Sequence, residues 1–487
     1  MSFINRINKK IIAYLLGLEV MVLVFMCLCS LIVSVIYNEE TQLKLFAICL
    51  FVYLLPASFL LYRNKDYHLP VAKKDGQILI GLLWILIPLF GALPYALNFG
   101  KFSIVDAIFE SFSGFTTTGS SIITDLSSMP KSILFYRSLS QWVGGLGFAV
   151  VIILTLKSRA GQMMNIFNAE FSSVYKNRMY PHLSDVALRI AVVYTSLTVI
   201  CFCLLNLGSM NVFQAICHSF STIATGGFST ENNNIGAFHD DYTIYVITIM
   251  MFLSGISYFV FVRLFKGDFK VLKDNQFIAF ILYIILTSAL FVVYTFSKGD
   301  VNVAKNIKNA LFYVVSILTT TGYDIQGYGN HIFISTMLIF LMFIGGCSAS
   351  SASGLKIIRV IQIIRYARAT MNKIFHPHAL IPIRYNGRAI EDGDMKNTLG
   401  FFFLYISIFV AGVFLLSCFG NGFSMSITLS IANLGNIGPV VGGYIHDFSY
   451  AWLNIPSKFV LIILMIIGRL EIFAFFALLS KSLWKRN

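Results

Sequence analysis

Three segments of the chain end in threonine and glycine in the same order, and a fourth segment resembles them. Residues 107–119 (AIFESFSGFTTTG) align without a gap on residues 310–322 (ALFYVVSILTTTG). Residues 215–226 (AICHSFSTIATG) fit the same frame with one residue deleted, and residues 426–438 (SITLSIANLGNIG) are a weaker copy. Each copy is a short apolar run followed by small or hydroxyl residues and a glycine. This pattern predicts a short helix that ends in an irregular loop.

The chemistry that such loops support is coordination of a cation by main-chain oxygen atoms. An ion filter replaces the water around an ion with backbone carbonyl groups that point at one axis. Glycine adopts backbone conformations that other residues avoid, and it lets several chain segments approach that axis closely. The helix before each loop directs the partial negative charge of its C-terminus toward the ion. Four such loops from one chain would complete a ring.

The last residues of the four segments are therefore predicted to form an ion filter. They are Thr117, Thr118, Gly119, Ala224, Thr225, Gly226, Thr320, Thr321, Gly322, Asn436, Ile437 and Gly438. The hydroxyl groups of Thr118, Thr225 and Thr321 would either add side-chain oxygens to the site or brace the loops. A different interpretation is that each Thr-Thr-Gly only caps a buried helix. Four copies in the same setting argue against it.

Each filter segment lies between long apolar segments that must position it. Hydrophobic residues make up 57% of the chain and charged residues 12%, without a long polar stretch. This composition is typical of an integral helical membrane protein. The apolar segments predict helices that can cross a hydrocarbon core of about 30 Å. These ten segments are 11–37, 43–62, 76–97, 132–157, 184–207, 241–265, 275–296, 332–365, 396–419 and 456–483.

The predicted fold class is an all-α integral membrane protein. Two N-terminal helices precede four helix–pore loop–helix repeats, arranged with pseudo-fourfold symmetry around a central ion pore. The pore-loop segments are too short to cross, so each is expected to enter the membrane and return. The predicted boundaries are 1–75 for the two helices, 76–160 for repeat 1, 161–266 for repeat 2, 267–368 for repeat 3 with an intramembrane gating loop, and 369–487 for a cytoplasmic linker and repeat 4.

The distribution of charge predicts the orientation of the chain. Basic residues such as Lys73, Lys157 and Arg263 cluster in alternate connections, whereas the intervening connections carry acidic residues such as Asp125 and Asp324. This is the positive-inside pattern, and it places both termini in the cytoplasm. The net charge of +14 thus reflects orientation and contact with anionic lipid. It gives no reason to infer a nucleic-acid partner.

The motifs of cofactor sites and enzymes are missing from the sequence. The eight cysteines lie in or beside apolar segments without zinc-type spacing, so they are interpreted as packing residues. There is no G-x-x-x-x-G-K-[ST] loop and no G-x-G-x-x-G after a strand. His376 and His378 have no further metal ligands near them in the sequence. We expect no bound cofactor and no enzymatic activity.

The second helix of the third repeat contains ten consecutive small residues, 345–354 (GGCSASSASG). With glycine at 345, 346 and 354, this run is a poor helix and a good flexible loop. We predict that Gly345, Gly346 and Gly354 belong to a gate below the filter. Close packing between membrane helices is an alternative role for small residues. The run occurs in only one of the four repeats, which favours a break of symmetry at one point.

Arg469 lies within the last apolar segment, where a cation is costly and usually functional. One interpretation is that its charge lies at the pore axis, repels cations and hydrogen-bonds the 345–354 loop. The alternative is local pairing with Glu471, or a side chain that reaches the interface. Near the outer mouth, carboxylates could concentrate cations, although a solvated or capping role is at least as plausible for each. These carboxylates are Glu110, Asp125, Glu231 and Asp324.

Several motifs together resemble a known family. They are SFSGFTTTGSS (111–121), RSLSQWVGGLGF (137–148), TIATGGFST (222–230), LTTTGYD (318–324), GGCSASSASGLKIIRV (345–360), HPHALIPIRYNGR (376–388), NLGNIGP (433–439) and GRLEIF (468–473). In these motifs the chain resembles the membrane subunits of the Trk/Ktr/HKT superfamily of potassium transporters. The two additional N-terminal helices suit the Trk branch best.

The resemblance implies potassium uptake across the bacterial cytoplasmic membrane, with K⁺ held at the filter residues and glycine at 119 favouring potassium over sodium. It also implies that the 345–354 loop obstructs the pore and moves to open it, with Arg469 holding it shut. Family members form dimers and carry a cytoplasmic nucleotide-binding regulatory subunit. The basic segment 356–396 is the candidate docking surface for that subunit, although a lipid-facing loop explains it almost as well.

A proton- or sodium-coupled potassium symporter is the main alternative function. It would need buried titratable residues along the path, and the candidates are Glu19, Asp185, Arg189, Arg469 and Glu471. A membrane enzyme has little support, because no paired carboxylates and no Ser/His/Asp grouping recur in the sequence. Cation uptake into vesicles with and without a second gradient would separate a pore from a symporter.

Overall fold

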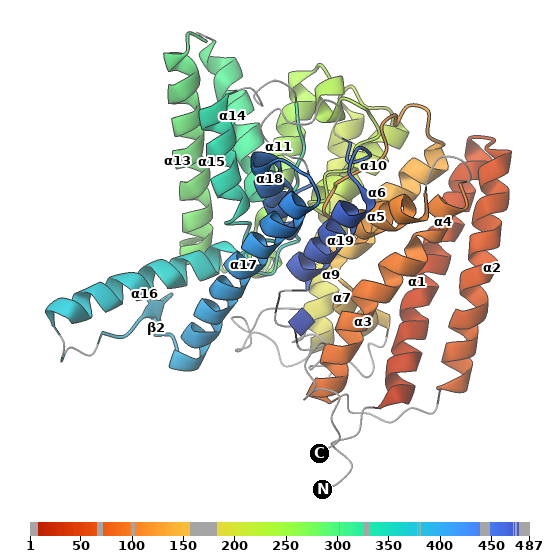
Figure 1. The fold of residues 1–487 in the computed structure, drawn as a ribbon, viewed down its shortest axis with the longest axis horizontal. Coiled ribbons are helices and arrows are strands. Elements are labelled where there is room, and N and C mark those ends of the chain that lie inside the picture. Colours follow the sequence, from red (N-terminus) through yellow and green to blue (C-terminus); the bar gives the residue numbers. More distant parts are fainter. Residues whose placement is uncertain are drawn as a thin grey trace, which may run out of the picture.

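The structure is a computed structural model that describes residues 8–65, 72–98, 103–155, 183–300, 302–325, 331–376, 378, 381–438, 449–470, 472, 475 and 476. In this part of the chain nearly every element is a helix (Figure 1). The described strands are β1 (Arg384–Tyr385) and β2 (Arg388–Ala389), which pair as a small antiparallel hairpin. The all-helical class predicted from the sequence is confirmed.

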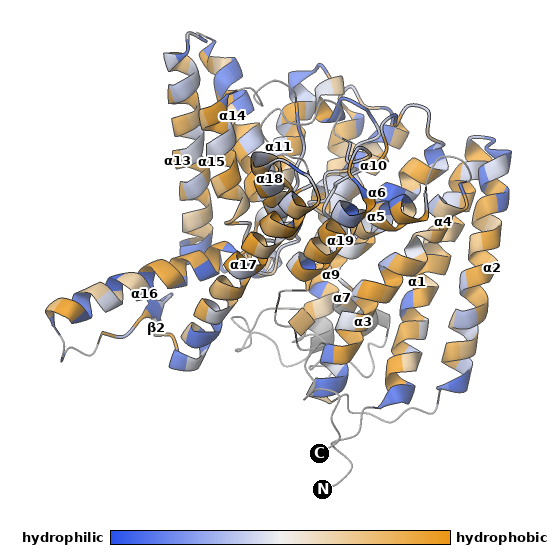
Figure 2. Cartoon of the chain, viewed as in Figure 1, coloured by the Kyte–Doolittle hydropathy of each residue, from blue (hydrophilic) through white to orange (hydrophobic). Residues whose placement is uncertain are grey.

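The chain begins with a pair of long apolar helices, α1 (Lys9–Ile36) and α2 (Glu40–Arg63). They lie side by side along their length at one edge of the molecule (Figure 1). Figure 2 shows apolar residues along both helices and hydrophilic residues at their ends. Large apolar side chains such as Leu55 are exposed on the outer face. Exposed apolar side chains suit a surface that faces lipid. The helical backbone suits it too, because a helix satisfies its own backbone hydrogen bonds.

Four sets of helices follow, each with a first helix, a short helix and a second helix. The first helices are α3 (Lys73–Gly91, followed by α4, Leu93–Ala96), α9 (Leu183–Asn206), α13 (Asn275–Ser297) and α17 (Asp392–Cys418). The short helices are α5 (Ile104–Phe115), α10 (Val212–Ile223), α14 (Val303–Leu318) and α18 (Phe423–Leu434). The second helices are α6 (Lys131–Leu146) with α7 (Phe148–Thr155), α11 (Asp241–Gly255) with α12 (Tyr258–Leu264), α15 (Ile332–Met342) with α16 (Ile357–Phe375), and α19 (Ile455–Arg469). Two 3₁₀ helices, η3 (Asn234–Ala237) and η4 (Phe269–Lys273), lie in connections.

Among the described residues, six helices are long and apolar enough to cross a membrane. A seventh crossing is possible if α11 and α12, which are bent by 90°, form one span. The chain is therefore a multi-pass helical membrane protein. The ten crossings expected from the sequence remain a prediction, because most of the second helices are interrupted.

These interruptions correct the expectation that only the third repeat has a broken second helix. Gly147, with φ of 86°, separates α6 from α7. Residues Ile256 and Ser257 separate α11 from α12. The third repeat has the longest of these breaks, from Phe343 to Lys356, and beyond it α16 points away from the body of the molecule (Figure 1). The third repeat thus differs from repeats 1 and 2 in the length of the loop that interrupts its second helix, and not in having an interruption.

The four sets are packed in a closed order. Each short helix contacts the first helix of its own set, in the pairs α3–α5, α9–α10, α13–α14 and α17–α18. Each short helix also contacts the second helix of the preceding set, in the pairs α6–α10, α11–α14, α15–α18 and α19–α5. Because α19 of the last set packs on α5 of the first, the contacts return to their starting point.

Candidate functional site

After each short helix the chain makes the same turn. We call the segments 116–119, 224–227, 319–322 and 435–438 turns 1 to 4. The second residue of each turn has a left-handed backbone, with φ of 56° at Thr117, 52° at Thr225, 58° at Thr320 and 52° at Asn436. The last residue of each turn is a glycine with positive φ: 83° at Gly119, 77° at Gly227, 77° at Gly322 and 91° at Gly438.

The same hydrogen bond also recurs in each turn. The third residue donates its amide to the carbonyl of the residue five positions earlier. These bonds join Thr118 to Ser113 (2.9 Å), Gly226 to Ser221 (2.8 Å), Thr321 to Ser316 (2.9 Å) and Ile437 to Ala432 (2.8 Å). A left-handed conformation at a residue with a Cβ costs roughly 1–3 kcal/mol and is concentrated at functional sites. Its recurrence in four turns therefore marks them as a candidate site.

Turn 2 differs from its predicted register by one residue. The sequence alignment equated Gly226 with Gly119, Gly322 and Gly438 after a deletion. In the structure, Gly227 has the equivalent backbone, and Gly226 takes the place of Thr118. Residues 215–227 thus align on the other segments without a gap. The role of the predicted residues as a filter remains a prediction.

The glycines allow neighbouring turns to touch. A Cβ atom at Gly119 would collide with the carbonyl oxygen of Gly226, and one at Gly227 would collide with that of Thr321. At Gly438 it would collide with the carbonyl oxygen of Thr118. Turn 1 therefore lies against turn 2, turn 2 against turn 3, and turn 4 against turn 1. These contacts follow the same cyclic order as the helices.

Two further glycines let second helices reach the ends of the short helices. A Cβ atom at Gly144 in α6 would collide with the carbonyl oxygen of Phe115, the last residue of α5. At Gly468 in α19 it would collide with the carbonyl oxygen of Leu434, the last residue of α18. Small residues allow membrane helices to approach closely, so these positions fix how near the turns lie to the second helices.

Threonine pairs brace turns 1 and 3. The hydroxyl oxygens of Thr116 and Thr118 lie 2.7 Å apart, and those of Thr319 and Thr321 lie 2.8 Å apart. The first threonine of each pair also donates to a carbonyl of its helix. The hydroxyls of Thr118 and Thr321 thus brace their turns, and their predicted role as side-chain oxygens of the site stays a prediction. Turns 2 and 4 have Ala224 with Gly226 and Gly435 with Ile437 at these positions, so they lack the pair.

Turn 4 is instead joined to turn 1 by side-chain amide and hydroxyl groups. The Nδ2 atom of Asn436 donates to the hydroxyl of Thr118 (2.9 Å) and to the carbonyl oxygen of Met465 (3.0 Å). The hydroxyl of Tyr450 donates to the carbonyl oxygen of Gly438. The hydroxyl of Ser120 donates to Oδ1 of Asn433 (2.9 Å). Asn436, which departs from the threonine pattern, therefore supplies a link between the last and first turns.

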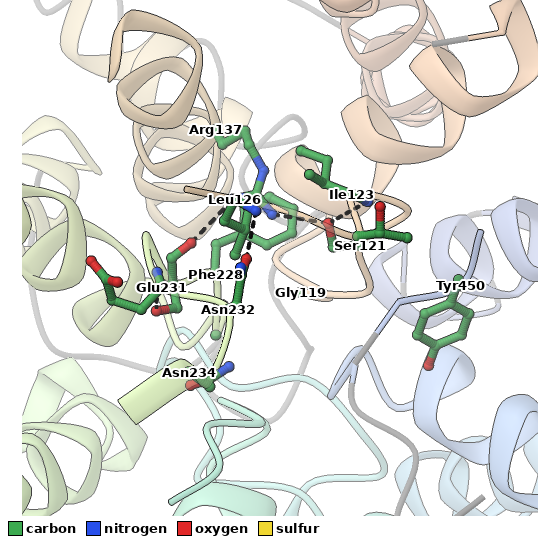
Figure 3. A pocket seen from close by; sticks show the side chains of 13 residues that line it. Gly119, Ser121, Ile123, Leu126, Arg137, Phe228, Glu231, Asn232, Asn234 and Tyr450 are labelled. Carbon is green, nitrogen blue, oxygen red and sulfur yellow. Dashed lines mark hydrogen bonds between the residues drawn. The ribbon is translucent and has the colours of Figure 1, made fainter. Parts of the chain in front are cut away.

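A buried ion pair lies behind turns 1 and 2. The Nε atom of Arg137 in α6 lies 2.7 Å from Oε1 of Glu110 in α5, and both side chains are buried. Arg137 also donates to the carbonyl oxygen of Ser229 (3.2 Å) and to the hydroxyl of Ser121 (3.1 Å), and its guanidinium lies 4.0 Å from the ring centre of Phe228. Figure 3 shows Arg137 reaching toward Ser121 and the chain around Phe228, beside a cavity of about 40 Å³. Glu110 is thus a buried partner of arginine and not a carboxylate exposed in the mouth.

We expect Glu110→Gln to destabilise the protein strongly, because it leaves the charge of Arg137 buried without its partner. Breaking a buried ion pair from one side costs about 3–5 kcal/mol. Asp268→Asn is the matched control, since Asp268 pairs with Arg263 where both side chains are about a third exposed. Exposed pairs contribute only about 0–1 kcal/mol. Thermal unfolding in detergent measures both, and equal losses would contradict the argument.

The other carboxylates near the turns are held by neighbouring groups. Donation from the Asn232 amide and the Ser127 hydroxyl keeps the pKa of the exposed Asp125 carboxyl below its ordinary value. Asp324 accepts from the hydroxyl of Tyr313 (2.5 Å). Glu231 accepts from Nε2 of Gln214 (2.7 Å). Each carboxylate thus has a local structural role, and Asp125 is charged at any physiological pH.

The loop of small residues 345–354, which we call the small-residue loop, lies against turns 2 and 3. The hydroxyl of Ser351 donates to the carbonyl oxygen of Ile223 (3.0 Å), the last residue of α10. The amide of Ser353 donates to the hydroxyl of Thr320 in turn 3 (3.0 Å). At the start of the loop, Gly345 has φ of 75°, and a Cβ there would collide with the Ser353 carbonyl oxygen. The two ends of the loop therefore meet, as its glycines permit.

Arg469, at the end of α19, bonds to the small-residue loop. Its Nη1 atom donates to the carbonyl oxygen of Ser351 (2.9 Å) and to the hydroxyl of Ser353 (3.2 Å). Its Nη2 atom donates to the carbonyl oxygen of Gly144 in α6 (2.7 Å). The group lies beside a cavity of about 60 Å³ that Gly354 and Lys356 also line. Arg469 thus connects repeat 4, the small-residue loop and repeat 1. The alternative partner Glu471 lies outside the described residues.

Other candidate residues lie on the long helices α1 and α9. Glu19 is buried in α1, and Arg189 lies in α9; the side chain of Asp185 is outside the described part. Among the described residues, no three His, Cys, Asp or Glu side chains gather as a metal site.

Within segment 356–396, the hydroxyl of Tyr385 and the amide of Asn386 donate to the carboxylate of Asp274. These two hydrogen bonds anchor the β1–β2 hairpin beside α13.

The sequence reasoning missed the polar residues of α6 that hold turn 2. Gln141 donates to the carbonyl oxygen of Gly226 (2.7 Å) and accepts from the amide of Phe228 (3.2 Å). Arg137 lies one helical turn earlier. The signal was present in RSLSQWVGGLGF, where two large polar residues stand four apart in an apolar segment. Such spacing places them on one helix face, but it does not reveal which loop they meet.

Comparisons with known proteins agree with this arrangement. Residues 42–486 match the TrkH family of cation transport proteins. The chain is 31% identical over 464 residues to the Trk system potassium uptake protein TrkH of Escherichia coli K12, covering 93% of this chain and 95% of that one. It is 28% identical to TrkG of the same strain, covering 99% and 100%. The crystal structure of the potassium transporter TrkH from Vibrio parahaemolyticus matches with a TM-score of 0.88 and 29% identity, covering 98% of this chain and 99% of that one.

The family model spans most of the chain, and the resemblance inferred from the sequence motifs is confirmed. Family membership also makes the chain a transport protein and not an enzyme. On this evidence, the chain belongs to the TrkH family of cation transport proteins.

Proposed function

We propose that this chain is the pore-forming membrane subunit of a potassium uptake system of the Trk type. The observation that carries the proposal is the set of four equivalent turns, which have the same left-handed backbone, with contacts between turns 1 and 2, turns 2 and 3, and turns 4 and 1. The relatives named for potassium uptake support potassium as the ion.

In this proposal the four turns surround K⁺ and replace its water with main-chain oxygens. The short helices all end at the turns, so the negative ends of their dipoles converge there. The ring is chemically uneven, since the carbonyl oxygens of Gly226 and Gly438 already accept hydrogen bonds from Gln141 and Tyr450. These two oxygens therefore contribute less to the ion than the unengaged carbonyls of the turns.

The small-residue loop is the proposed gate. It lies directly against turns 2 and 3, where a bulky segment would obstruct the exit of ions from the filter. Arg469 holds the loop by two hydrogen bonds and places a positive charge beside it. A cation that leaves the filter would meet both barriers, so transport requires the loop and Arg469 to separate.

The proposed setting is the bacterial cytoplasmic membrane, with both termini in the cytoplasm and two copies of the chain in each complex. A cytoplasmic nucleotide-binding subunit would open the gate through segment 356–396. Two features support this segment. Its helix α16 follows the small-residue loop directly, and it has exposed basic residues such as Arg368 and Lys373. A displacement of α16 would therefore pull on the gate.

Uptake of rubidium into vesicles that contain the purified protein tests the function. A potential that is negative inside should drive uptake without any proton or sodium gradient. A coupled symporter, the remaining alternative, would stall without the second gradient. Two described carboxylates support the uncoupled pore: Glu19 lies in α1, and Glu110, the buried carboxylate behind turns 1 and 2, is paired with Arg137. Absence of uptake under every gradient would refute transport.

A further inference from the structure

We propose that Gln141 is a positioning residue that sets the ion selectivity of the pore, by clamping turn 2 from helix α6. This inference rests on the proposed role of the four turns as a filter. It starts from a difference between the turns. Turns 1 and 3 are braced internally by threonine pairs, whereas turn 2 has Ala224 and Gly226 at those positions and has no such brace.

The side chain of Gln141 is built to replace that brace. It is fully buried. Its Nε2 atom donates to the carbonyl oxygen of Gly226 (2.7 Å), and its Oε1 atom accepts from the amide of Phe228 (3.2 Å). The two bonds fall on either side of Gly227, whose φ is 77°. One amide thus holds the chain before and after the glycine that contacts turn 3.

Helix α6 supports the clamp along three successive turns of helix. Arg137, four residues before Gln141, bonds to the carbonyl oxygen of Ser229. Gly145, four residues after it, lies so close to Ala224 that a Cβ atom there would overlap it. Residues four apart share a helix face, so α6 follows the chain from Ala224, the first residue of turn 2, to Ser229, two residues beyond it. Because Glu110 holds Arg137, the same helix also fixes turn 2 relative to turn 1.

The clamp matters for selectivity because it limits how turn 2 can move. A filter discriminates between ions by the spacing of its carbonyl oxygens or by their number and field. In either case, a turn that can shift toward a smaller ion lowers the cost of accepting sodium. Loss of Gln141 would therefore reduce discrimination against sodium, which differs from a simple loss of stability.

The test compares Gln141→Met, Gln141→Asn and Thr198→Val with the unchanged protein in vesicles. The readout is the ability of sodium to compete with rubidium uptake under a fixed potential. Gln141→Met removes both hydrogen bonds. Gln141→Asn shortens the side chain by one CH₂ group, so its amide cannot reach the Gly226 carbonyl and the Phe228 amide together. A hydrogen bond that contributes about 0.5–1.5 kcal/mol net corresponds to a change of about twofold to tenfold in an equilibrium constant. The selectivity for rubidium over sodium should therefore fall by about that factor in both Gln141 variants.

Thr198→Val is the matched control, because Thr198 accepts a hydrogen bond from Nε1 of Trp142 in α6 and donates to the carbonyl oxygen of Tyr194, and neither partner belongs to a turn. Its selectivity should equal that of the unchanged protein. Thermal unfolding identifies any variant that fails to fold, and the shorter, polar Gln141→Asn remains informative if Gln141→Met does not fold. Unchanged selectivity in folded Gln141 variants, or an equal loss in Thr198→Val, overturns the inference and leaves the proposed function intact. Absence of rubidium uptake by the unchanged protein overturns the proposed function itself.

Discussion

Gly227→Ala is expected to reduce rubidium uptake to background. Two physical effects act at this position. The residue has φ of 77°, and a Cβ atom would collide with the carbonyl oxygen of Thr321 in the neighbouring turn. The left-handed backbone alone costs a residue with a Cβ about 1–2 kcal/mol. The collision is with backbone, which has no flexible end to move aside, so turns 2 and 3 must separate. Uptake into vesicles under an imposed potential measures the loss.

Gly299→Ala separates the two effects. Gly299 has φ of 91°, but a Cβ atom there meets nothing within 4 Å. This control therefore has the backbone strain without the collision, and we expect it to lower stability slightly and to leave uptake unchanged. If Gly227→Ala transported rubidium as well as Gly299→Ala does, then turns 2 and 3 would not form a closely packed filter.

The same position illustrates what the sequence could not determine. Ala-Thr-Gly-Gly offers two glycines for one place in the turn, and pairing Thr225-Gly226 with the other Thr-Gly steps required a deletion. The distance from the end of the short helix settles the alignment, since the glycine with positive φ that ends the turn is the fourth residue after the helix in all four turns. The helix end is a structural fact that composition places only to within a few residues.

The long helices were predictable for the opposite reason. Apolar runs of twenty or more residues have few alternatives to a membrane helix, and repetition of the threonine–glycine segments predicted four similar units. The breaks at Gly147 and at Ile256–Ser257 were missed because one or two residues give little local signal. Contacts between distant residues, such as Gln141 with Gly226, depend on how the units pack. Helical periodicity identifies the face on which Gln141 lies but not its partner.

Arg469→Ala is expected to increase rubidium uptake in vesicles that lack any regulatory partner. The change removes two hydrogen bonds to the small-residue loop, one hydrogen bond to Gly144 and a positive charge beside the loop. A hydrogen bond to a charged group contributes about 1.5–3 kcal/mol. Loss of even one such bond in the closed state alone would raise the open population by about tenfold or more, as long as the closed state predominates.

Arg469→Lys distinguishes the charge from the hydrogen bonds. Lysine keeps a positive charge but lacks the planar fork with which Arg469 reaches Ser351 and Gly144 together. If the bonds hold the loop in place, Arg469→Lys should approach the uptake of Arg469→Ala. If repulsion of cations dominates, its uptake should remain near that of the unchanged protein. A folded Arg469→Ala protein with unchanged uptake would contradict both explanations, because Arg469 would then be only a structural link between α19, the small-residue loop and α6.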